Sequence, residues 1–215
     1  MNLEKGLDII RNTGVVAIMR TRSSEQLLRA ADAIREGGVC AIEVTMTTPG
    51  ALSVIEQAAS RYDQDVLFGA GTVLDAESAR AAILAGAQFI VAPTLNQGLI
   101  TLCRRYSIPV MPGAYTPTEA LTAWECGADM VKIFPAGVGG PGFIKALKAP
   151  LPQIDLVPVG GVTLDNTAEF IRAGAAAVGV GSALINQKLL ESKDFATLTD
   201  RARRLVEEVA RGRAR

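Results

Sequence analysis

Short apolar runs and helical stretches alternate along the whole chain. One phrase recurs, consisting of a helical stretch, a glycine and then an apolar run, and it appears at 36–43, 85–91, 126–132 and 173–180. The glycine suits the position just after a helix, where the left-handed backbone would be costly for a residue with a Cβ. The interval is too long for one strand–helix unit but suits two, so we expect another strand and helix between successive phrases.

The intervening strands are predicted at four further apolar runs, which lie at 15–19, 66–69, 108–111 and 156–159. Hydrophobic strands that alternate strictly with helices are typical of a parallel sheet. Eight such units predict an α/β protein with a single (β/α)8 TIM barrel over 1–215. An open, doubly wound sheet is the alternative, and the lack of a GxGxxG motif after the first run weighs against it. An extra N-terminal helix is predicted before the first strand, at 2–12.

Helix start signals fit this scheme. Thr116-Pro117 places a hydroxyl at the N-cap and a proline at the first helical position, and Glu119 completes a capping box. Thr48-Pro49 carries the same hydroxyl–proline pattern, and Asp75 is a further N-cap candidate. These signals predict helices that begin just after the strand ends.

Composition narrows the chemistry that the chain can perform. Hydrophobic residues make up 49% and charged residues 20%, with a formal net charge of zero, which gives no electrostatic case for nucleic acid or an anionic membrane. We expect no secretory signal and no membrane span. The three cysteines are widely spaced, which favours reduced thiols and a cytoplasmic protein. Because there is no histidine, Ser-His and Cys-His nucleophile pairs and histidine metal sites are excluded.

Two charged residues fall inside otherwise apolar strands. Lys132 lies in the run Met130–Pro135, and Glu43 alternates with Ile42 and Val44. A buried lysine loses hydration, so its pKa falls and some of it becomes the neutral, nucleophilic amine that forms a Schiff base with a ketone. A lysine whose ammonium reaches water, or a structural Lys–Glu ion pair, is the alternative. Because function in such barrels gathers at the carboxyl ends of the strands, we expect the two residues to share a site.

Glycines follow the last two predicted strands, as Gly160-Gly161 and Gly181-Ser182. Barrels commonly bind phosphate at this place, because glycine lets backbone N–H groups approach an anion closely. A helix that begins at Ser182 would add its positive end. Tight turns that need positive φ are the alternative explanation, yet both pairs lie where the fold predicts a phosphate site.

Five motifs follow one another along the chain: Glu43-Val44-Thr45, Gly69-Ala70-Gly71-Thr72-Val73, Pro112-Gly113, Val131-Lys132-Ile133-Phe134-Pro135 and Val159-Gly160-Gly161-Val162. Together they resemble one known family, the bacterial 2-keto-3-deoxy-6-phosphogluconate (KDPG) and 4-hydroxy-2-oxoglutarate (KHG) aldolases. The resemblance covers nearly the whole chain, in order and with matching spacing. It implies a class I aldolase that works without a metal or another cofactor, folds as a (β/α)8 barrel and forms a homotrimer.

The resemblance also implies roles for individual residues. Lys132 resembles the Schiff-base lysine and Glu43 the general acid and base. The pyruvyl pocket would be lined by Thr72, Pro93 and Phe134, and the phosphate would meet Gly160, Gly161, Gly181 and Ser182. One departure is that Thr47 stands where many members have the arginine that binds the substrate carboxylate. We expect Arg20, at the end of the first strand, to supply that guanidinium.

The predicted activity is cleavage of a 2-oxo-4-hydroxy acid to pyruvate and an aldehyde. The expected substrates are 2-dehydro-3-deoxy-6-phosphogluconate, 4-hydroxy-2-oxoglutarate or both, and 2-dehydro-3-deoxy-6-phosphogalactonate is the alternative. Two other classes remain open: a sugar-phosphate isomerase or epimerase that uses Glu43 and Lys132 without a covalent step, and a non-catalytic barrel that binds a phosphate. The non-catalytic barrel requires neither the lysine nor the carboxylate.

Overall fold

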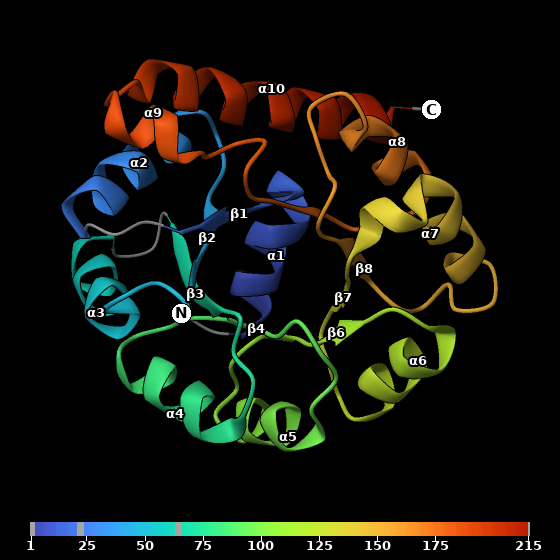
Figure 1. The fold of residues 1–215 in the computed structure, drawn as a ribbon. Helices are drawn as coiled ribbons and strands as arrows, with labels where there is room; N and C mark the ends of the chain where they lie inside the picture. Colours follow the sequence, from blue (N-terminus) through green and yellow to red (C-terminus); the bar gives the residue numbers. More distant parts are fainter. Residues whose placement is uncertain (1–2, 21–23, 63–65, 215) are drawn as a thin grey trace.

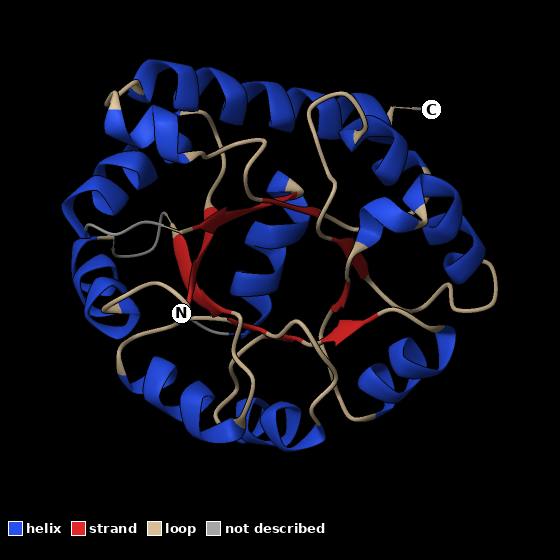
Figure 2. Ribbon diagram, viewed as in Figure 1, coloured by secondary structure: helices blue, strands red, loops and turns tan. Residues whose placement is uncertain are grey.

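A curled parallel sheet forms the centre of the molecule, and helices surround it. The computed structural model describes residues 3–20, 24–62 and 66–214. Figure 2 shows the strands on the inside of this α/β fold and, apart from the N-terminal helix, the helices on the outside. Within the described residues, no helix is both long enough and apolar enough to cross a membrane.

Strands and helices alternate along most of the chain. The strands are β1 (Val15–Met19), β2 (Ala41–Thr45), β3 (Leu67–Gly71), β4 (Ile90–Val91), β5 (Val110–Met111), β6 (Gly113–Ala114), β7 (Val131–Ile133), β8 (Leu156–Pro158) and β9 (Val178–Val180). The helices are α1 (Leu3–Thr13), α2 (Ser24–Glu36), α3 (Ala51–Arg61), α4 (Ala76–Leu84), α5 (Gln97–Arg105), α6 (Pro117–Glu125), the 3-10 helix η1 (Ala136–Val138), α7 (Gly140–Lys148), α8 (Thr167–Arg172), α9 (Gln187–Glu191) and α10 (Phe195–Arg213). The exceptions to the alternation are the consecutive pairs β5 and β6, η1 and α7, and α9 and α10.

The sheet follows chain order, with strands in the orders β5-β4-β3-β2-β1-β9 and β6-β7-β8. The neighbouring strands within each group are parallel. The two groups are linked on one side by a parallel bridge between Val159 and Gly179. On the other side, β5 and β6 are the two halves of one run interrupted at Pro112, whose carbonyl accepts a hydrogen bond of 2.9 Å from the Lys132 N–H. Proline has no N–H to donate to a ladder, so the run is divided into β5 and β6 there.

Two apolar clusters hold the fold together. The outer cluster joins the helices to the outward side chains of the strands, such as Ile42, Val44 and Val131. The inner cluster contains inward side chains such as Val16, Leu67 and Met130. Because side chains alternate between the two faces of a strand, one strand can supply both clusters, as β2 does with Ile42 and Ala41.

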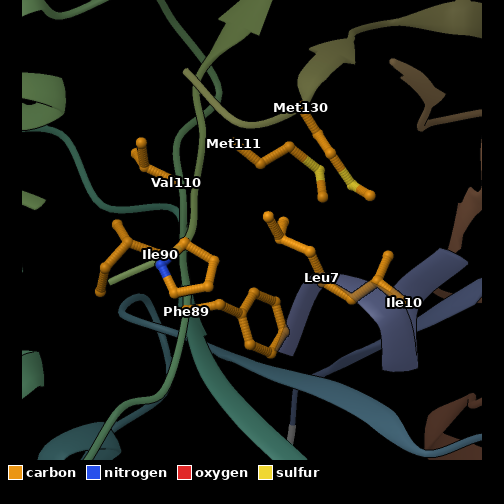
Figure 3. A pocket seen from close by; sticks show the side chains of 8 residues that line it. Leu7, Ile10, Phe89, Ile90, Val110, Met111 and Met130 are labelled. Carbon is orange, nitrogen blue, oxygen red and sulfur yellow. The ribbon is translucent and has the colours of Figure 1, made fainter. Parts of the chain in front are cut away.

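Helix α1 covers the amino-terminal end of the strands (Figure 1). Its Leu7 and Ile10 join the inner cluster and point toward Phe89, Met111 and Met130 (Figure 3). The apolar cavity left between them measures only about 10 Å³. That volume is roughly the minimum that one water molecule needs, and the lining offers it few polar partners. This end of the sheet is therefore packed and dry.

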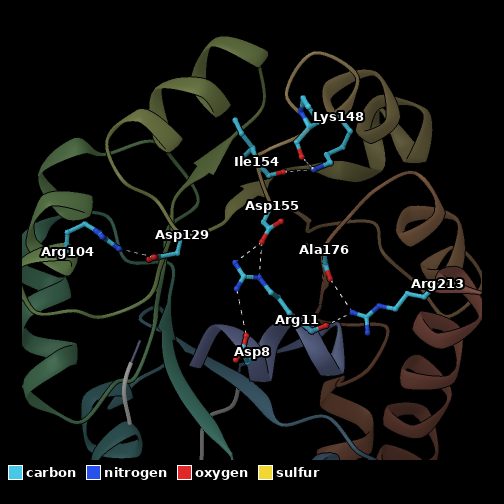
Figure 4. A network of polar contacts seen from close by, with 10 residues as sticks. Asp8, Arg11, Arg104, Asp129, Lys148, Ile154, Asp155, Ala176 and Arg213 are labelled. Atoms are coloured by element: carbon cyan, nitrogen blue, oxygen red, sulfur yellow. Dashed lines mark hydrogen bonds and ion pairs between the residues drawn. The ribbon is translucent and has the colours of Figure 1, made fainter. Parts of the chain in front are cut away.

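Polar contacts fasten α1 to distant parts of the chain (Figure 4). Arg11 donates to the Asp155 carboxylate, with Nη2–Oδ2 at 2.9 Å. Arg213, at the end of α10, donates to the carbonyls of Asn12, at 2.9 Å, and of Arg11. Arg213 therefore satisfies carbonyls that the last turn of α1 leaves without a partner.

Candidate active site

Lys132 points to the inside of the curled sheet. Its neighbours Val131 and Ile133 belong to the outer cluster, whereas Met130, on the same face as Lys132, belongs to the inner one. The side chain is only 5% exposed. Burial lowers the pKa of the Lys132 ammonium; the Glu43 charge opposes this shift and the Arg20 charge adds to it. The structure thus increases the fraction of neutral amine at this position.

The Phe134 ring lies beside the amine. The Lys132 Nζ is 5.1 Å from the ring centroid, which is within the range of a cation–π contact. Phe134 is itself 39% exposed, an unusual state for a phenylalanine at the end of a buried strand. The ring therefore presents an apolar surface to solvent next to the amine.

Glu43 also points inward, from β2, which lies across the curled sheet from β7 (Figure 1). It alternates with Ile42 and Val44 of the outer cluster and is 2% exposed. Burial raises the pKa of the Glu43 carboxyl, while the charges of Lys132 and Arg20 act to lower it. Glu43 and Lys132 make no direct ion pair within the described part of the chain, yet each changes the pKa of the other. An acid–base group thus lies within electrostatic reach of the amine.

Arg20 follows β1 and is exposed. It borders a cavity of about 270 Å³ together with Gly181 and Ser182, which were predicted to meet a phosphate. Ile18, Ile185, Asn186 and Gln187 complete the lining. Arg20 is therefore adjacent to the predicted phosphate residues while its charge also acts on Glu43 and Lys132.

The Gly160-Gly161 pair forms a turn that only glycine fits well. Its φ angles are 81° and 88°, in the left-handed region. The turn is tied to η1, because the Gly137 N–H donates to the Gly160 carbonyl at 2.7 Å. The Asn166 side-chain amide donates to the Gly161 carbonyl at 2.9 Å. A Cβ on Gly160 would come within 3.1 Å of the Phe134 ring, so the turn borders the amine site.

Thr72 and Pro93 follow β3 and β4 at the same end of the sheet. Thr72 has a φ of 57°, which is uncommon for a residue other than glycine. Both residues are half-buried. The strained backbone at Thr72 marks a place where the surrounding structure fixes the chain firmly.

The helix predicted to begin at Ser182 does not start there. The chain instead turns at Gly181, whose carbonyl accepts from Leu184 and Ile185, and α9 begins at Gln187 with Asn186 as its N-cap. The Asn186 side chain accepts from the Leu189 N–H at 3.0 Å and so competes with an earlier start. The prediction of a helix end aimed at an anion from Ser182 was therefore wrong.

Comparison with known proteins agrees with this geometry. The family model described as KDPG and KHG aldolase matches residues 7–201. The chain belongs to the KDPG and KHG aldolase family. It is therefore an aldolase, an aldehyde-lyase.

Individual members of the family cover most of the chain. The 2-dehydro-3-deoxy-6-phosphogalactonate aldolase of Escherichia coli is 40% identical over 79% of this chain and 83% of its own. The 2-dehydro-3-deoxy-phosphogluconate aldolase of Treponema pallidum is 36% identical over 91% of both chains. The solved KDPG aldolase of Legionella pneumophila, which holds pyruvate as a covalent carbinolamine, is 27% identical, with a TM-score of 0.86 over 94% of this chain and 97% of its own.

Thr47, where many members of the aldolase family carry arginine, belongs to a group of threonines. The Thr45 hydroxyl lies 3.1 Å from that of Thr47 and 3.2 Å from that of Thr48. Thr45 and Thr48 are buried, whereas Thr47 is exposed. These hydroxyls bond to one another and bring no positive charge to the site.

Two residues near the aldolase site were missed by sequence reasoning. Asn166 holds the Gly160-Gly161 turn through its side chain, and Gly71 lies against the Glu43 carboxylate. An Asn close after a Gly-Gly pair is a weak signal of such a turn, because asparagine side chains often bond to nearby backbone. The contact of Gly71 joins two strands and has no local signal. Among the described residues, no group of three or more His, Cys, Asp or Glu side chains could hold a metal ion.

Proposed function

We propose that this aldolase is a class I enzyme and that Lys132 is its Schiff-base lysine. The observation that carries the proposal is a lysine that is 5% exposed, points inside the sheet and has a pKa lowered mainly by burial. The neutral amine is the form that adds to a ketone. The covalent pyruvate carbinolamine of the Legionella pneumophila relative supports the same chemistry here.

The proposed reaction begins when the Lys132 amine adds to the C2 ketone of a 2-oxo-4-hydroxy acid. The carbinolamine then loses water to give an iminium ion. Glu43 removes the proton of the C4 hydroxyl, the C3–C4 bond breaks, and its electron pair moves to the iminium, which becomes an enamine. The aldehyde leaves, Glu43 returns a proton to C3, and water releases pyruvate and the free amine.

The raised pKa of Glu43 suits both of its proposed proton transfers. A carboxyl whose pKa lies above its usual range is closer to the operating pH, where a group accepts and returns protons most effectively. Lys132 and Arg20 limit the shift, since their positive charges favour the carboxylate.

We propose that the pyruvyl half of the substrate lies between Phe134, Pro93 and Thr72, with its carboxylate held by Arg20. The Arg20 charge is near Glu43 and Lys132, as the electrostatic effects on their pKa values indicate. A guanidinium can hold a carboxylate through two hydrogen bonds. Thr47 has no charge to offer, so the anion needs this partner.

The phosphate end is proposed to meet Gly160, Gly161, Gly181 and Ser182. Positive φ angles at the first two and the cavity beside the other two support this assignment. Because Arg20 borders the same cavity, its role as carboxylate anchor has to be tested against a role at the phosphate.

The proposed substrate is 2-dehydro-3-deoxy-6-phosphogluconate or 4-hydroxy-2-oxoglutarate, or both. The phosphogalactonate compound is a second candidate, which the 40% identity to the Escherichia coli aldolase favours. The two phosphorylated compounds differ at C4, where the bond breaks. Coupled detection of pyruvate with all three compounds tests the proposal. Cleavage of none of them would contradict it, and the ratio between the two phosphorylated compounds assigns the C4 preference.

We also propose that 1–215 form one complete (β/α)8 barrel. The Val159–Gly179 bridge and the hydrogen bond from Lys132 to Pro112 support closure, since they link the two groups of strands on both sides. A homotrimer, as the family resemblance implies, is proposed as the assembly, and sedimentation equilibrium would test it. The cysteines Cys40, Cys103 and Cys126 form no disulfide in the described structure, which supports a cytoplasmic location.

A further inference from the structure

Gly71 is the last residue of β3, and its backbone does not require glycine. Its φ is outside the left-handed region in which the structure places Gly160 and Gly161. It pairs with Thr45 of β2 in the parallel ladder, and its carbonyl accepts from the Met46 N–H at 2.8 Å. Another residue type could adopt the same strand geometry. The glycine is therefore explained by the lack of room for a side chain at position 71.

The space beside Gly71 is filled by the Glu43 carboxylate. A Cβ built on Gly71 would lie 2.5 Å from Glu43 Oε1, 2.7 Å from Cδ and 3.2 Å from Oε2. Real Cβ atoms essentially never come closer than 3.0 Å to such neighbours. The carboxylate therefore lies against the backbone of β3, where any side chain at 71 would displace it.

The carboxylate has little room to move elsewhere. Glu43 is only 2% exposed. Its neighbour in the β3 ladder is Gly69. The space beside Gly69 is not open to the carboxylate, because the Phe89 ring fills it and lies 2.4 Å from where a Cβ on Gly69 would be. In an interior packed this closely, the addition of even one methyl group displaces neighbouring atoms.

We propose that Gly71 is a positioning residue for the aldol reaction: by leaving its side-chain volume empty, it lets the Glu43 carboxylate lie against β3 at the depth where it exchanges protons with the substrate. The catalytic part of this inference rests on the proposed role of Glu43 as acid and base. The steric part, that the carboxylate occupies the Gly71 side-chain space, does not.

The catalytic part is tested with Gly71→Ala. A misplacement of a catalytic group by about 1 Å can cost roughly 100-fold in rate, so we expect kcat to fall about 100-fold. KM should change little, because the groups proposed to bind the carboxylate and phosphate are left in place. The matched control is Gly142→Ala in α7, where a Cβ meets nothing within 4 Å, and its kcat should equal that of the unmodified protein. A Gly71→Ala enzyme with normal kcat would overturn the catalytic part.

The steric part is tested by combining Gly71→Ala with Glu43→Ala and measuring thermal unfolding. Overpacking typically costs about 1–3 kcal/mol, which for a chain of this size lowers Tm by roughly 5 °C. The loss caused by Gly71→Ala should disappear in the Glu43→Ala background, because the carboxylate that it displaces is gone. An equal loss of Tm in both backgrounds would overturn the proposal.

Failure of the single variant to fold is also informative. If Gly71→Ala alone does not fold, Gly71→Ala with Glu43→Ala should fold as Glu43→Ala does, and a double variant that stays unfolded would contradict the steric claim. The proposed function fails separately, if Glu43→Ala alone keeps full activity. In that case the Tm cycle still decides whether the carboxylate fills the Gly71 space.

Discussion

The two ends of the curled sheet differ in the partners that they give to buried ionisable side chains. At the amino-terminal end, Asp129 has a side chain only 7% exposed, and it accepts from the Val110 N–H at 2.9 Å and from Arg104 at 3.0 Å. Burial raises the pKa of Asp129, and these two partners act to lower it. At the carboxyl-terminal end, Glu43 and Lys132 are buried within electrostatic reach and make no direct ion pair in the part of the chain described.

This difference assigns the amino-terminal end of the sheet to stability and the carboxyl-terminal end to chemistry. A buried charge with its hydrogen bonds satisfied is a structural element, whereas buried groups without direct partners lower the stability of the fold and remain available to react. The same separation appears in the apolar residues. Leu7 and Ile10 seal the amino-terminal end, while Phe134 stays exposed at the other. We therefore expect substitutions at the two ends to have different consequences.

Lys132→Met should have the largest effect, a loss of kcat of about 10⁴-fold or more, because no other group replaces a covalent nucleophile. The isosteric apolar side chain also removes a buried charge, so Tm should be unchanged or higher. Pyruvate release and thermal unfolding are the measurements, with the exposed Lys145→Met as the control. A fall in Tm together with retained activity would place Lys132 among the structural charges.

Arg20→Ala should follow, with a loss of kcat/KM of roughly 100-fold or more. If the bound carboxylate is buried, loss of its charged partner costs about 2–5 kcal/mol, and each 1.4 kcal/mol corresponds to a factor of ten. If Arg20 holds the pyruvyl carboxylate, 4-hydroxy-2-oxoglutarate and the phosphorylated substrate suffer equally. A loss confined to the phosphorylated substrate would move Arg20 to the phosphate. Adding Thr47→Arg should restore part of the activity.

Ile10→Ala, at the opposite end, should change stability rather than chemistry. Ile10 is 1% exposed and packs in the inner cluster, so its truncation should lower the free energy of unfolding by about 2–5 kcal/mol. Urea denaturation measures this loss, and kcat of the folded fraction should be unchanged. Leu84→Ala, at a side chain that is 69% exposed, is the matched control and should alter stability by less than about 0.5 kcal/mol. A large fall in kcat for Ile10→Ala would show that the two ends are coupled.

The smallest effect should be a shift in the pH dependence of kcat/KM. The amine of Lys132 is unreactive when protonated, so kcat/KM falls as pH drops through its pKa. The Arg20 charge lowers this pKa and the Glu43 charge raises it. Arg20→Ala should therefore move the acid-side limb to higher pH, and Glu43→Gln should move it to lower pH. Arg105→Ala, at an exposed cation on α5, should leave it in place, and a limb that stays fixed in all three variants would assign it to another group.

Local signals predicted many elements of the fold. The capping box of Thr116 and Glu119 and the N-cap at Asp75 are confirmed, because both depend only on side chains within one turn. The N-cap predicted at Thr48 was wrong: α3 begins at Ala51 after Gly50, and the Thr48 hydroxyl lies instead beside that of Thr45. The Thr48 side chain thus makes a different local contact in place of the predicted cap.

The candidate site could be predicted where a charged residue lies within an otherwise apolar strand. Lys132 and Glu43 stand out for this reason, and the structure buries both. The contact of Gly71 with the Glu43 carboxylate joins two strands and left no such signal, so it could not be read from spacing. Asn166, which holds the Gly161 turn, gave only a weak local signal. The α9 start at Gln187 depended on a local cap at Asn186, which competes with the start predicted at Ser182.

The most direct test of the account is covalent trapping at Lys132. The protein is incubated with pyruvate, reduced with borohydride, digested and analysed by mass spectrometry. The account predicts one pyruvyl-derived adduct on Lys132, loss of activity in proportion to its formation, and no adduct in Lys132→Met. An adduct on Lys145 or Lys148 instead, with activity retained in Lys132→Met, would contradict it.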